Sequence, residues 1–325
     1  MRFLFVLLPA ALLQVAVRLG LPDVIGQADA LIIFKTADVH SRSLSAILER
    51  RQSKTSREIK GRGYMNREKV LSKQAFICDM DGVIYHGDRL LPGAREFVDW
   101  LKQNKKKYLF LTNSSERSPR ELHQKLERLG LEVPEENFYT SALATGIFLK
   151  NQHPQGSAYV IGEAGLINAL YEAAITMNNV NPDFVVVGES HSYTFESLVK
   201  AVNLVRKGAR LIGTNPDLTG PVEDAIIPAT GALISPIELA TENKAYFIGK
   251  PNPLMMRNAL KILGSRREET VIIGDRMDTD IIAGIESEIE TVLVLSGVTN
   301  REHIERYAYR PHLVLNGIGE ILESN

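Results

Sequence analysis

The chain has 325 residues, a formal net charge of −1 at pH 7 and 44% hydrophobic residues, a profile typical of a globular protein with one large domain or two moderate ones. Neither this charge nor any stripe of aromatic and basic residues indicates nucleic acid as a partner. Cys78 is the single cysteine, which excludes an internal disulfide framework and favours a reducing compartment.

The first 72 residues differ from the rest of the chain and are predicted to lie outside the fold. Residues 3–17 form an apolar run that resembles the hydrophobic part of a signal peptide but is shorter than the about 20 residues of a membrane span. Residues 35–69 are polar and basic, which indicates a solvated linker. Three interpretations stay open: an extension outside the working protein, with Met65 as the real start; an anchor or export segment; or an accessory helix. We expect a cytoplasmic protein, with membrane contact or export only if this segment is real.

From Lys73 onward, short apolar runs alternate with amphipathic stretches, which predicts an α/β fold built around a parallel sheet. The predicted strands end at Cys78, Leu111, Ile161, Val187, Ile212, Ile248, Ile273 and Leu295. Helices are predicted over 94–102 and 119–129. Ser118 precedes the second helix and Glu121 follows three residues later, so we expect a capping box at its start.

Chemically reactive side chains follow four of the predicted strands. They are Asp79 and Asp81, then Thr112 with Asn113, then Lys250, and finally Asp275 with Asp280. Because the carboxyl ends of parallel strands meet at one edge of a sheet, we expect these side chains to face a shared site.

These residue types suit a phosphate group and a divalent cation. Carboxylates crowded into one cleft raise one another's pKa unless a cation compensates, and Mg²⁺ takes oxygen ligands such as Asp79 and Asp275. Lys250 supplies a point charge for a phosphate oxygen or for the nucleophile. Thr112 and the N–H groups after it can donate to the remaining phosphate oxygens. The set predicts a phosphoryl-transfer site.

Rate considerations favour a two-step mechanism. Hydrolysis of a phosphate monoester is among the slowest uncatalysed reactions, whereas one general acid or base contributes only about 10²- to 10⁴-fold. More than one effect must therefore act. A carboxylate nucleophile splits the displacement into two steps, and we expect Asp79 to attack while Asp81 protonates the leaving oxygen and later takes a proton from water.

Four short segments carry a resemblance to a known family. DMDG (79–82), TNSS (112–115), GKPNP (249–253) and GDRMDTD (274–280) resemble, in this order, the four motifs of the haloacid dehalogenase superfamily of phosphatases. Further segments such as LLPGA, VNPDFVVVGE, GTNPD and PATGAL closely resemble the NagD-type ribonucleotide monophosphatases, relatives of the p-nitrophenyl phosphatases. The likeness runs from Lys73 nearly to the C-terminus.

The resemblance implies a role for each motif residue. Asp79 would be the nucleophile and a Mg²⁺ ligand, and Asp81 the acid and base, which also binds the metal through its backbone carbonyl. Thr112 and Asn113 would bind the phosphoryl group, and Lys250 would orient the nucleophile and the phosphate. Asp275 would complete the metal site, with Asp280 supporting it from behind.

The resemblance also implies a Rossmann-like core with an inserted cap domain. The chain between Thr112 and Lys250 is much longer than a crossover needs, and its excess has its own βα pattern. We therefore expect a core over 73–152 and 244–325 and an α/β cap of the C2 type over 153–243. The cap loops over 214–217 and 228–231 are expected to face the substrate. Their candidate contacts are Asn215, Asp217 and Thr230.

The leading prediction is a Mg²⁺-dependent phosphatase for small phosphorylated metabolites, with nucleoside 5′-monophosphates such as UMP as substrates. The alternatives are a phosphoglycolate, pyridoxal-phosphate or sugar-phosphate phosphatase, or a binding protein of the same fold that has lost turnover. Homo-dimers or tetramers formed through the cap are expected from the family. Arg276 and Asp278 are predicted to lie at the surface or behind the ligands, and His86 and His191 to be ordinary polar residues rather than ligands.

Overall fold

The structure, a computed structural model of the chain, describes residues 65–222 and 225–323. The apolar run over 3–17 and most of the predicted linker lie outside these residues. Within the described part, no helix is both long and apolar enough to cross a membrane. The residues from Met65 onward form one compact unit, in which Met65 and Val70 are part of a buried cluster. The prediction that all of the first 72 residues lie outside the fold is therefore wrong for residues 65–72.

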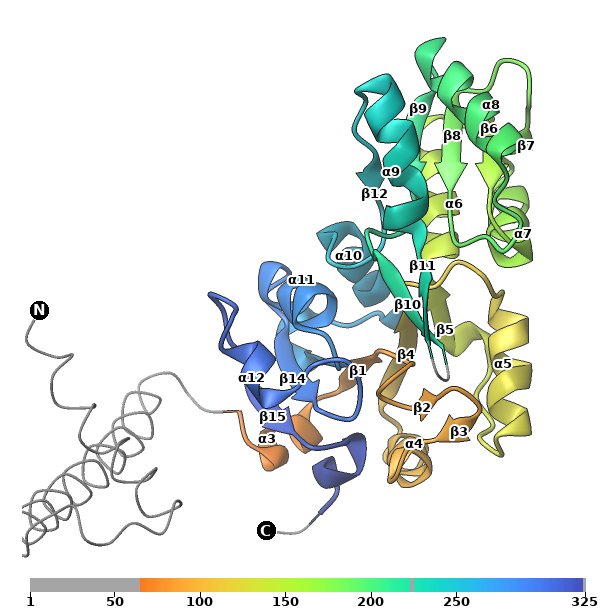
Figure 1. Ribbon diagram of the computed structural model, residues 1–325. Coiled ribbons are helices and arrows are strands. Elements are labelled where there is room, and N and C mark those ends of the chain that lie inside the picture. Colours follow the sequence, from red (N-terminus) through yellow and green to blue (C-terminus); the bar gives the residue numbers. More distant parts are fainter. Residues whose placement is uncertain (1–64, 223–224, 324–325) are drawn as a thin grey trace, which may run out of the picture. The chain divides into compact units, whose positions relative to one another are not determined.

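A parallel sheet forms the centre of the predicted core (Figure 1). Strand β1 (Ala75–Cys78) pairs with β13 (Thr270–Gly274) on one side and with β4 (Lys107–Thr112) on the other. The described strands follow the order β15-β14-β13-β1-β4-β5. The outer strands are β5 (Phe138–Thr140), β14 (Glu290–Val294) and β15 (Leu313–Leu315). The chain runs outward from β1 to β5 and later returns to β13, so the topological switch point lies beside β1, where open α/β sheets bind ligands.

Helices cover both faces of this sheet because its strands are apolar on both sides. In β1, Phe76 and Cys78 pack into one buried cluster with α4 and α5, whereas Ala75 and Ile77 pack into another with α6 and α10. The core helices are α3 (Arg67–Ser72), α4 (Ala94–Gln103), α5 (Pro119–Arg128), α6 (Ser141–Gln152), α10 (Pro253–Leu263), α11 (Ile282–Glu286) and α12 (Arg301–Ile304).

Shorter elements complete the core. A small antiparallel hairpin joins β2 (Tyr85–His86) to β3 (Arg89–Leu90) directly after the first motif. A π-helical turn spans Met277–Ile281 in the last motif. The 3₁₀ turns are Glu135–Asn137, Arg267–Glu269 and Ile318–Ile321.

A second parallel sheet forms the inserted unit, which we call the cap and define as Ser157–Phe247. Its described strands follow the order β12-β9-β8-β6-β7. They are β6 (Ser157–Ile161), β7 (Thr176–Met177), β8 (Phe184–Val187), β9 (Arg210–Gly213) and β12 (Tyr246–Phe247). Its helices are α7 (Ala164–Glu172), α8 (Phe195–Arg206) and α9 (Thr230–Thr241). An antiparallel hairpin of β10 (Thr219–Val222) and β11 (Ala225–Pro228) projects from the cap sheet (Figure 1).

Most of the predicted elements are confirmed. Each of the eight predicted strand ends lies within one residue of an observed end. The predicted capping box is present, since Ser118 Oγ accepts from Glu121 N while the Glu121 carboxylate accepts from Ser118 N.

One expected strand belongs to the other sheet. Tyr246–Phe247, which leads to Lys250, was assigned to the core, but β12 pairs with β9 and so extends the cap past the predicted boundary at residue 243. An edge strand of two residues carries no sequence signal for the sheet it joins. Lys250 therefore follows a cap strand and not a strand of the core sheet.

Candidate active site

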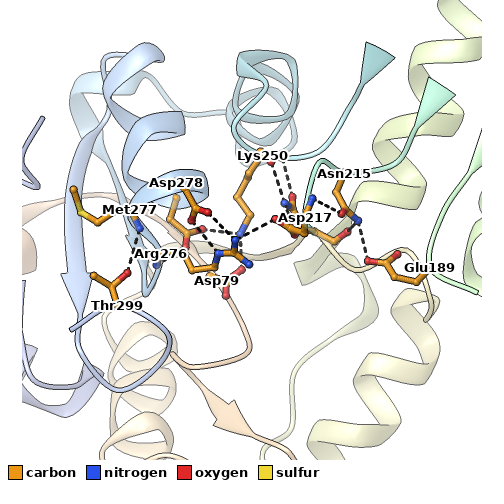
Figure 2. A network of polar contacts seen from close by, with 11 residues as sticks. Asp79, Glu189, Asn215, Asp217, Lys250, Arg276, Met277, Asp278 and Thr299 are labelled. Carbon is orange, nitrogen blue, oxygen red and sulfur yellow. Dashed lines mark hydrogen bonds and ion pairs between the residues drawn. The ribbon is translucent and has the colours of Figure 1, made fainter. Parts of the chain in front are cut away.

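Lys250 lies at the centre of the site and joins two acidic side chains (Figure 2). Its Nζ lies 2.5 Å from Asp79 Oδ1 and 2.7 Å from Asp280 Oδ1. The same nitrogen lies 3.4 Å from the carbonyl oxygen of Leu111, the penultimate residue of β4. The Lys250 side chain is only 3% exposed, so its charge acts where water screens little.

Asp79 extends the central strand into the site. Its backbone N–H donates to Ile273 O at 2.8 Å, which continues the β1–β13 ladder by one residue. Lys250 holds one carboxylate oxygen, and no hydrogen bond to the other oxygen is present among the described residues. Asp79 therefore keeps a free oxygen at the carboxyl end of β1.

Asp275 follows β13 and approaches the chain so closely that glycine is required at two positions. Gly82 has φ +76°, and a Cβ there would lie 2.7 Å from Asp275 Oδ2. A Cβ on Gly297 would lie 2.1 Å from the same oxygen. Val298 N donates to this oxygen at 2.7 Å. The two glycines thus let two loops close around one carboxylate.

Asp280 is placed by the π-helical turn, a feature often found at functional sites. Its Oδ1 binds Lys250, and its Oδ2 accepts from Arg276 N at 3.1 Å. Both oxygens are therefore engaged by the protein. That Asp280 supports the metal site from behind stays a prediction.

The three carboxylates form a site that fits a divalent cation. One carboxylate oxygen from each of Asp79, Asp275 and Asp280 lies within 4.8 Å of the other two. Burial raises the pKa of Asp275 to about 7, and the Asp280 charge adds to this rise. Burial also raises the pKa of Asp79 well above its ordinary value, although Lys250 lowers it in part. For Lys250, burial opposes the charged form, but Asp280 and Asp79 outweigh it and raise the pKa. Negative charge in excess of one lysine is what a bound Mg²⁺ would neutralise.

The second motif divides its tasks between two residues. Thr112 ends β4, and its Oγ1 accepts from Ser114 N at 3.1 Å. The Asn113 side chain brackets the backbone of Lys250: its Oδ1 accepts from Lys250 N at 2.7 Å and its Nδ2 donates to Lys250 O at 3.0 Å. Asn113 is thus committed to holding the lysine, whereas Thr112 is the more accessible phosphate-binding candidate.

Asp81 is the most open of the predicted catalytic acids, with its side chain 45% exposed. The imidazole Nδ1 of His86 lies 3.4 Å from Asp81 Oδ1. Burial raises the pKa of Asp81, and the charges of His86 and Lys125 oppose this rise. A raised pKa suits a group that must donate a proton. His86, which was predicted to be an ordinary polar residue, therefore lies next to a residue of the site.

Two of the three predicted cap contacts lie in the junction with the core. Asn215 and Thr230 are fully buried. Asn215 Nδ2 donates to Asn113 O and to Glu189 Oε1, both at 2.8 Å. Thr230 Oγ1 lies 3.2 Å from Thr214 Oγ1. Because these side chains are enclosed and already bonded, we assign them to the junction and not to substrate contact.

The third predicted cap residue, Asp217, reaches the site itself (Figure 2). Its Oδ2 accepts from Asn113 Nδ2 at 3.0 Å, and its Oδ1 lies 3.5 Å from Arg276 of the core. Arg276 also binds Asp278 through two nitrogens. Arg276 was expected at the surface or behind the ligands. It links the cap to the loop that carries Asp275.

Sequence reasoning missed Glu189, a half-buried carboxylate at the junction. Its Oε2 accepts from Ser115 N at 3.0 Å and from the Ser115 hydroxyl, and its Oε1 accepts from Asn215. Burial raises its pKa, and these hydrogen bonds oppose the rise. An acid two residues after the apolar run 184–187 was the available signal, but one such residue is equally typical of a loop.

Comparisons with known proteins agree with this fold and geometry. Models of the haloacid dehalogenase-like hydrolase and HAD-hydrolase-like families match residues 76–176 and 247–321. Dihydroxyacetone phosphatase of Corynebacterium glutamicum is 46% identical over 249 residues, 77% of this chain and 90% of that protein. Ribonucleotide monophosphatase NagD of Escherichia coli is 42% identical over 245 residues, 75% and 96% of the two chains. The crystal structure of 4-nitrophenylphosphatase from Thermotoga maritima superposes with a TM-score of 0.75 at 34% identity, over 78% and 97%.

The fold, the four motifs and these relatives define the class: the chain belongs to the haloacid dehalogenase superfamily, in the NagD-type phosphatases of subfamily IIA. It is a hydrolase that acts on phosphoric monoester bonds.

Proposed function

We propose that this protein hydrolyses small phosphate monoesters through an aspartyl-phosphate intermediate, with Mg²⁺ as cofactor. The observation that carries the proposal is the pairing of Lys250 with Asp79 at 2.5 Å beside Asp275. It leaves a carboxylate oxygen free at the switch point of the sheet and keeps a buried cation next to it. This arrangement suits a nucleophile and an incoming phosphoryl group.

In the first step, the free oxygen of Asp79 attacks phosphorus, and the bond between phosphorus and the ester oxygen breaks. The leaving oxygen takes its proton from the Asp81 carboxyl. Lys250 keeps Asp79 oriented and offsets charge on the transferring group, while the Thr112 hydroxyl and nearby N–H groups hold phosphoryl oxygens. Groups that are already oriented before the reaction are what electrostatic stabilisation of a transition state requires.

In the second step, water attacks phosphorus of the aspartyl phosphate. The Asp81 carboxylate takes a proton from this water, inorganic phosphate leaves and Asp79 is restored. One residue thus donates a proton in the first step and accepts one in the second. This requires a pKa near the working pH, and the raised pKa of Asp81 supports the assignment.

The carboxylates of Asp79 and Asp275 and the backbone carbonyl of Asp81 would hold Mg²⁺. When bound, the ion neutralises charge on the phosphate and on the cluster. Asp280 has both oxygens engaged and so supports the site without needing to bind the ion.

For the substrate, we propose nucleoside 5′-monophosphates such as UMP, supported by the relative named ribonucleotide monophosphatase. A sugar phosphate is the second candidate, because the relative that is 46% identical is named dihydroxyacetone phosphatase. Measuring kcat/KM for mononucleotides, dihydroxyacetone phosphate, sugar phosphates, phosphoglycolate and pyridoxal phosphate would decide between them. Equal values across that panel would contradict a nucleotide-specific role.

The chemistry is tested by release of phosphate from p-nitrophenyl phosphate with and without Mg²⁺. We expect Asp79→Asn to lower kcat by at least about 10³-fold, because an amide cannot act as the nucleophile. Asp99→Asn is the matched control, since Asp99 is exposed on α4. Equal release by the wild type and Asp79→Asn would refute the mechanism, and no release by the wild type from any ester of the panel would favour a binding protein without turnover.

A further inference from the structure

Lys125 on α5 is a buried lysine that the proposed mechanism does not use. Its residue is 8% exposed, and no hydrogen bond or ion pair of its ammonium group is present among the described residues. Burying an ammonium group that has no hydrogen-bond acceptor costs free energy. Burial lowers the pKa of Lys125, and the charges of Asp81, Asp88 and Glu116 oppose this change. A close contact would offset more of the cost.

That contact is the ring of Tyr85. The Lys125 Nζ lies 3.9 Å from the ring centroid, a close cation–π geometry. Tyr85 is itself buried and begins the hairpin β2–β3. The pair therefore fixes the first strand of this hairpin against α5.

Tyr85 closes the loop that carries Asp81. Gly82 N donates to Tyr85 O at 2.8 Å, and Tyr85 N donates to Met80 O at 3.2 Å. Asp81 and Tyr85 also form an isolated β-bridge. The backbone of Asp81 is thus held by a loop whose far end is anchored through the Tyr85 ring.

From this chain of contacts, we propose that Lys125 is a positioning residue for Asp81, acting through the ring of Tyr85. The proposal rests on the role of Asp81 as the acid of the first step. The Asp81 side chain is 45% exposed, and among the described residues it makes one ion pair, with His86 at 3.4 Å. Its carboxyl direction therefore depends on its loop. Without the anchor, the loop gains freedom and the carboxyl less often points at the leaving oxygen.

Leaving groups of different basicity separate this role from a general loss of stability. The p-nitrophenolate ion leaves with little need of a proton, whereas phenolate is more basic and needs the acid. The two phosphate esters are otherwise closely matched in size. Because kcat/KM reports the steps up to phosphoryl transfer, its ratio for phenyl phosphate over p-nitrophenyl phosphate measures the contribution of the acid.

We expect Lys125→Met to lower this ratio by about tenfold, part of the 10²- to 10⁴-fold that a general acid contributes. Tyr85→Leu should lower it similarly, and the double variant no further, since both act through one contact. Lys125→Arg keeps a cation over the ring and should restore most of the ratio. Lys106→Met is the matched control, because Lys106 lies over the Trp100 ring at 5.7 Å, away from Asp81.

An unchanged ratio in Lys125→Met would overturn the inference, as would additive effects in the double variant. Asp81→Asn keeps the two possible failures apart. If it lowers the ratio and Lys125→Met does not, Asp81 is the acid and Lys125 does not position it. If Asp81→Asn leaves the ratio unchanged, the proposed function itself is wrong at this step. Thermal unfolding of each variant shows whether a lower kcat/KM ratio is accompanied by a lower Tm.

Discussion

We expect the metal-free protein, prepared by removing Mg²⁺ with EDTA, to become less stable as the pH rises. Its free energy of unfolding should fall steadily between about pH 4 and about pH 7. The reason is Asp275, whose pKa is raised by burial from 3.8 to about 7 in the folded chain. Between these values the carboxyl is protonated in the folded state and ionised in the unfolded chain. The folded state therefore binds more protons than the unfolded chain in this range. The contribution of the Asp275 proton to the free energy of unfolding is full below about pH 4 and is lost as the pH rises through about 7.

The size of the effect follows from the same two pKa values. At 1.36 kcal/mol for each pH unit, the interval between them corresponds to about 4 kcal/mol for this one group. Asp79 acts in the same direction, because burial raises its pKa as well. Mg²⁺ requires ionised carboxylates and must displace the Asp275 proton. Its affinity should therefore rise up to about tenfold per pH unit below about pH 7 and then level off.

Two measurements check this prediction. Calorimetric titration with Mg²⁺ should give a dissociation constant at about pH 7.5 at least tenfold lower than at about pH 5.5. Thermal unfolding with and without Mg²⁺ should show a gain in Tm that increases over the same range. Asp275→Asn should remove most of the pH dependence, whereas Asp99→Asn should retain it. A dissociation constant that stays the same at both pH values would refute the reasoning.

Two further substitutions test the geometry of the site. Gly297→Ala would place a Cβ 2.1 Å from Asp275 Oδ2, so we expect the carboxylate to be displaced and Mg²⁺ affinity to fall about tenfold or more, a loss that second-sphere changes commonly cause; unchanged titration curves would contradict this. Asn215→Ala removes one of two donors to the Asn113 carbonyl oxygen, which still accepts from the Ser141 hydroxyl, and leaves Glu189 Oε1 without its donor. We expect this to cost about 1–3 kcal/mol of unfolding free energy and to lower activity equally for nucleotide and sugar phosphates. A selective loss for one substrate class would instead identify Asn215 as a substrate contact.

The core of the site could be predicted because strand ends carry its residues. Asp79 and Asp275 follow apolar runs that are buried on both faces, and such runs indicate strands of a parallel sheet. Once both strands are placed in one sheet, their carboxyl ends must meet. The same reasoning predicted that Lys250 lies near Asp79, which the structure confirms. It was wrong about the strand before Lys250, which belongs to the cap sheet and not to the core sheet.

The cap could not be predicted in the same detail, because its polar residues are placed by contacts distant in sequence. The sequence around Asn215 and Thr230 does not distinguish side chains that face a substrate cleft from side chains that are buried between the cap and the core. The Asn215 side chain is held by hydrogen bonds to Asn113 and Glu189, which are 102 and 26 residues away in the sequence. Lys125 shows the same limit, since a lysine on an amphipathic helix is usually solvated and only the Tyr85 ring reveals otherwise.

Asn113 connects the cap directly to Lys250. Its side chain brackets the backbone of Lys250 and also binds Asp217, while its carbonyl oxygen accepts from Asn215. Lys250 itself stands only three residues after the cap strand β12. A shift of the cap is therefore transmitted to Lys250 through one amide and one short loop, without a flexible spacer. If Lys250 orients Asp79 as proposed, a substrate that alters the cap should change the orientation of Asp79 as well as the fit of the leaving group. Selectivity among phosphate esters should for this reason appear in kcat as well as in KM.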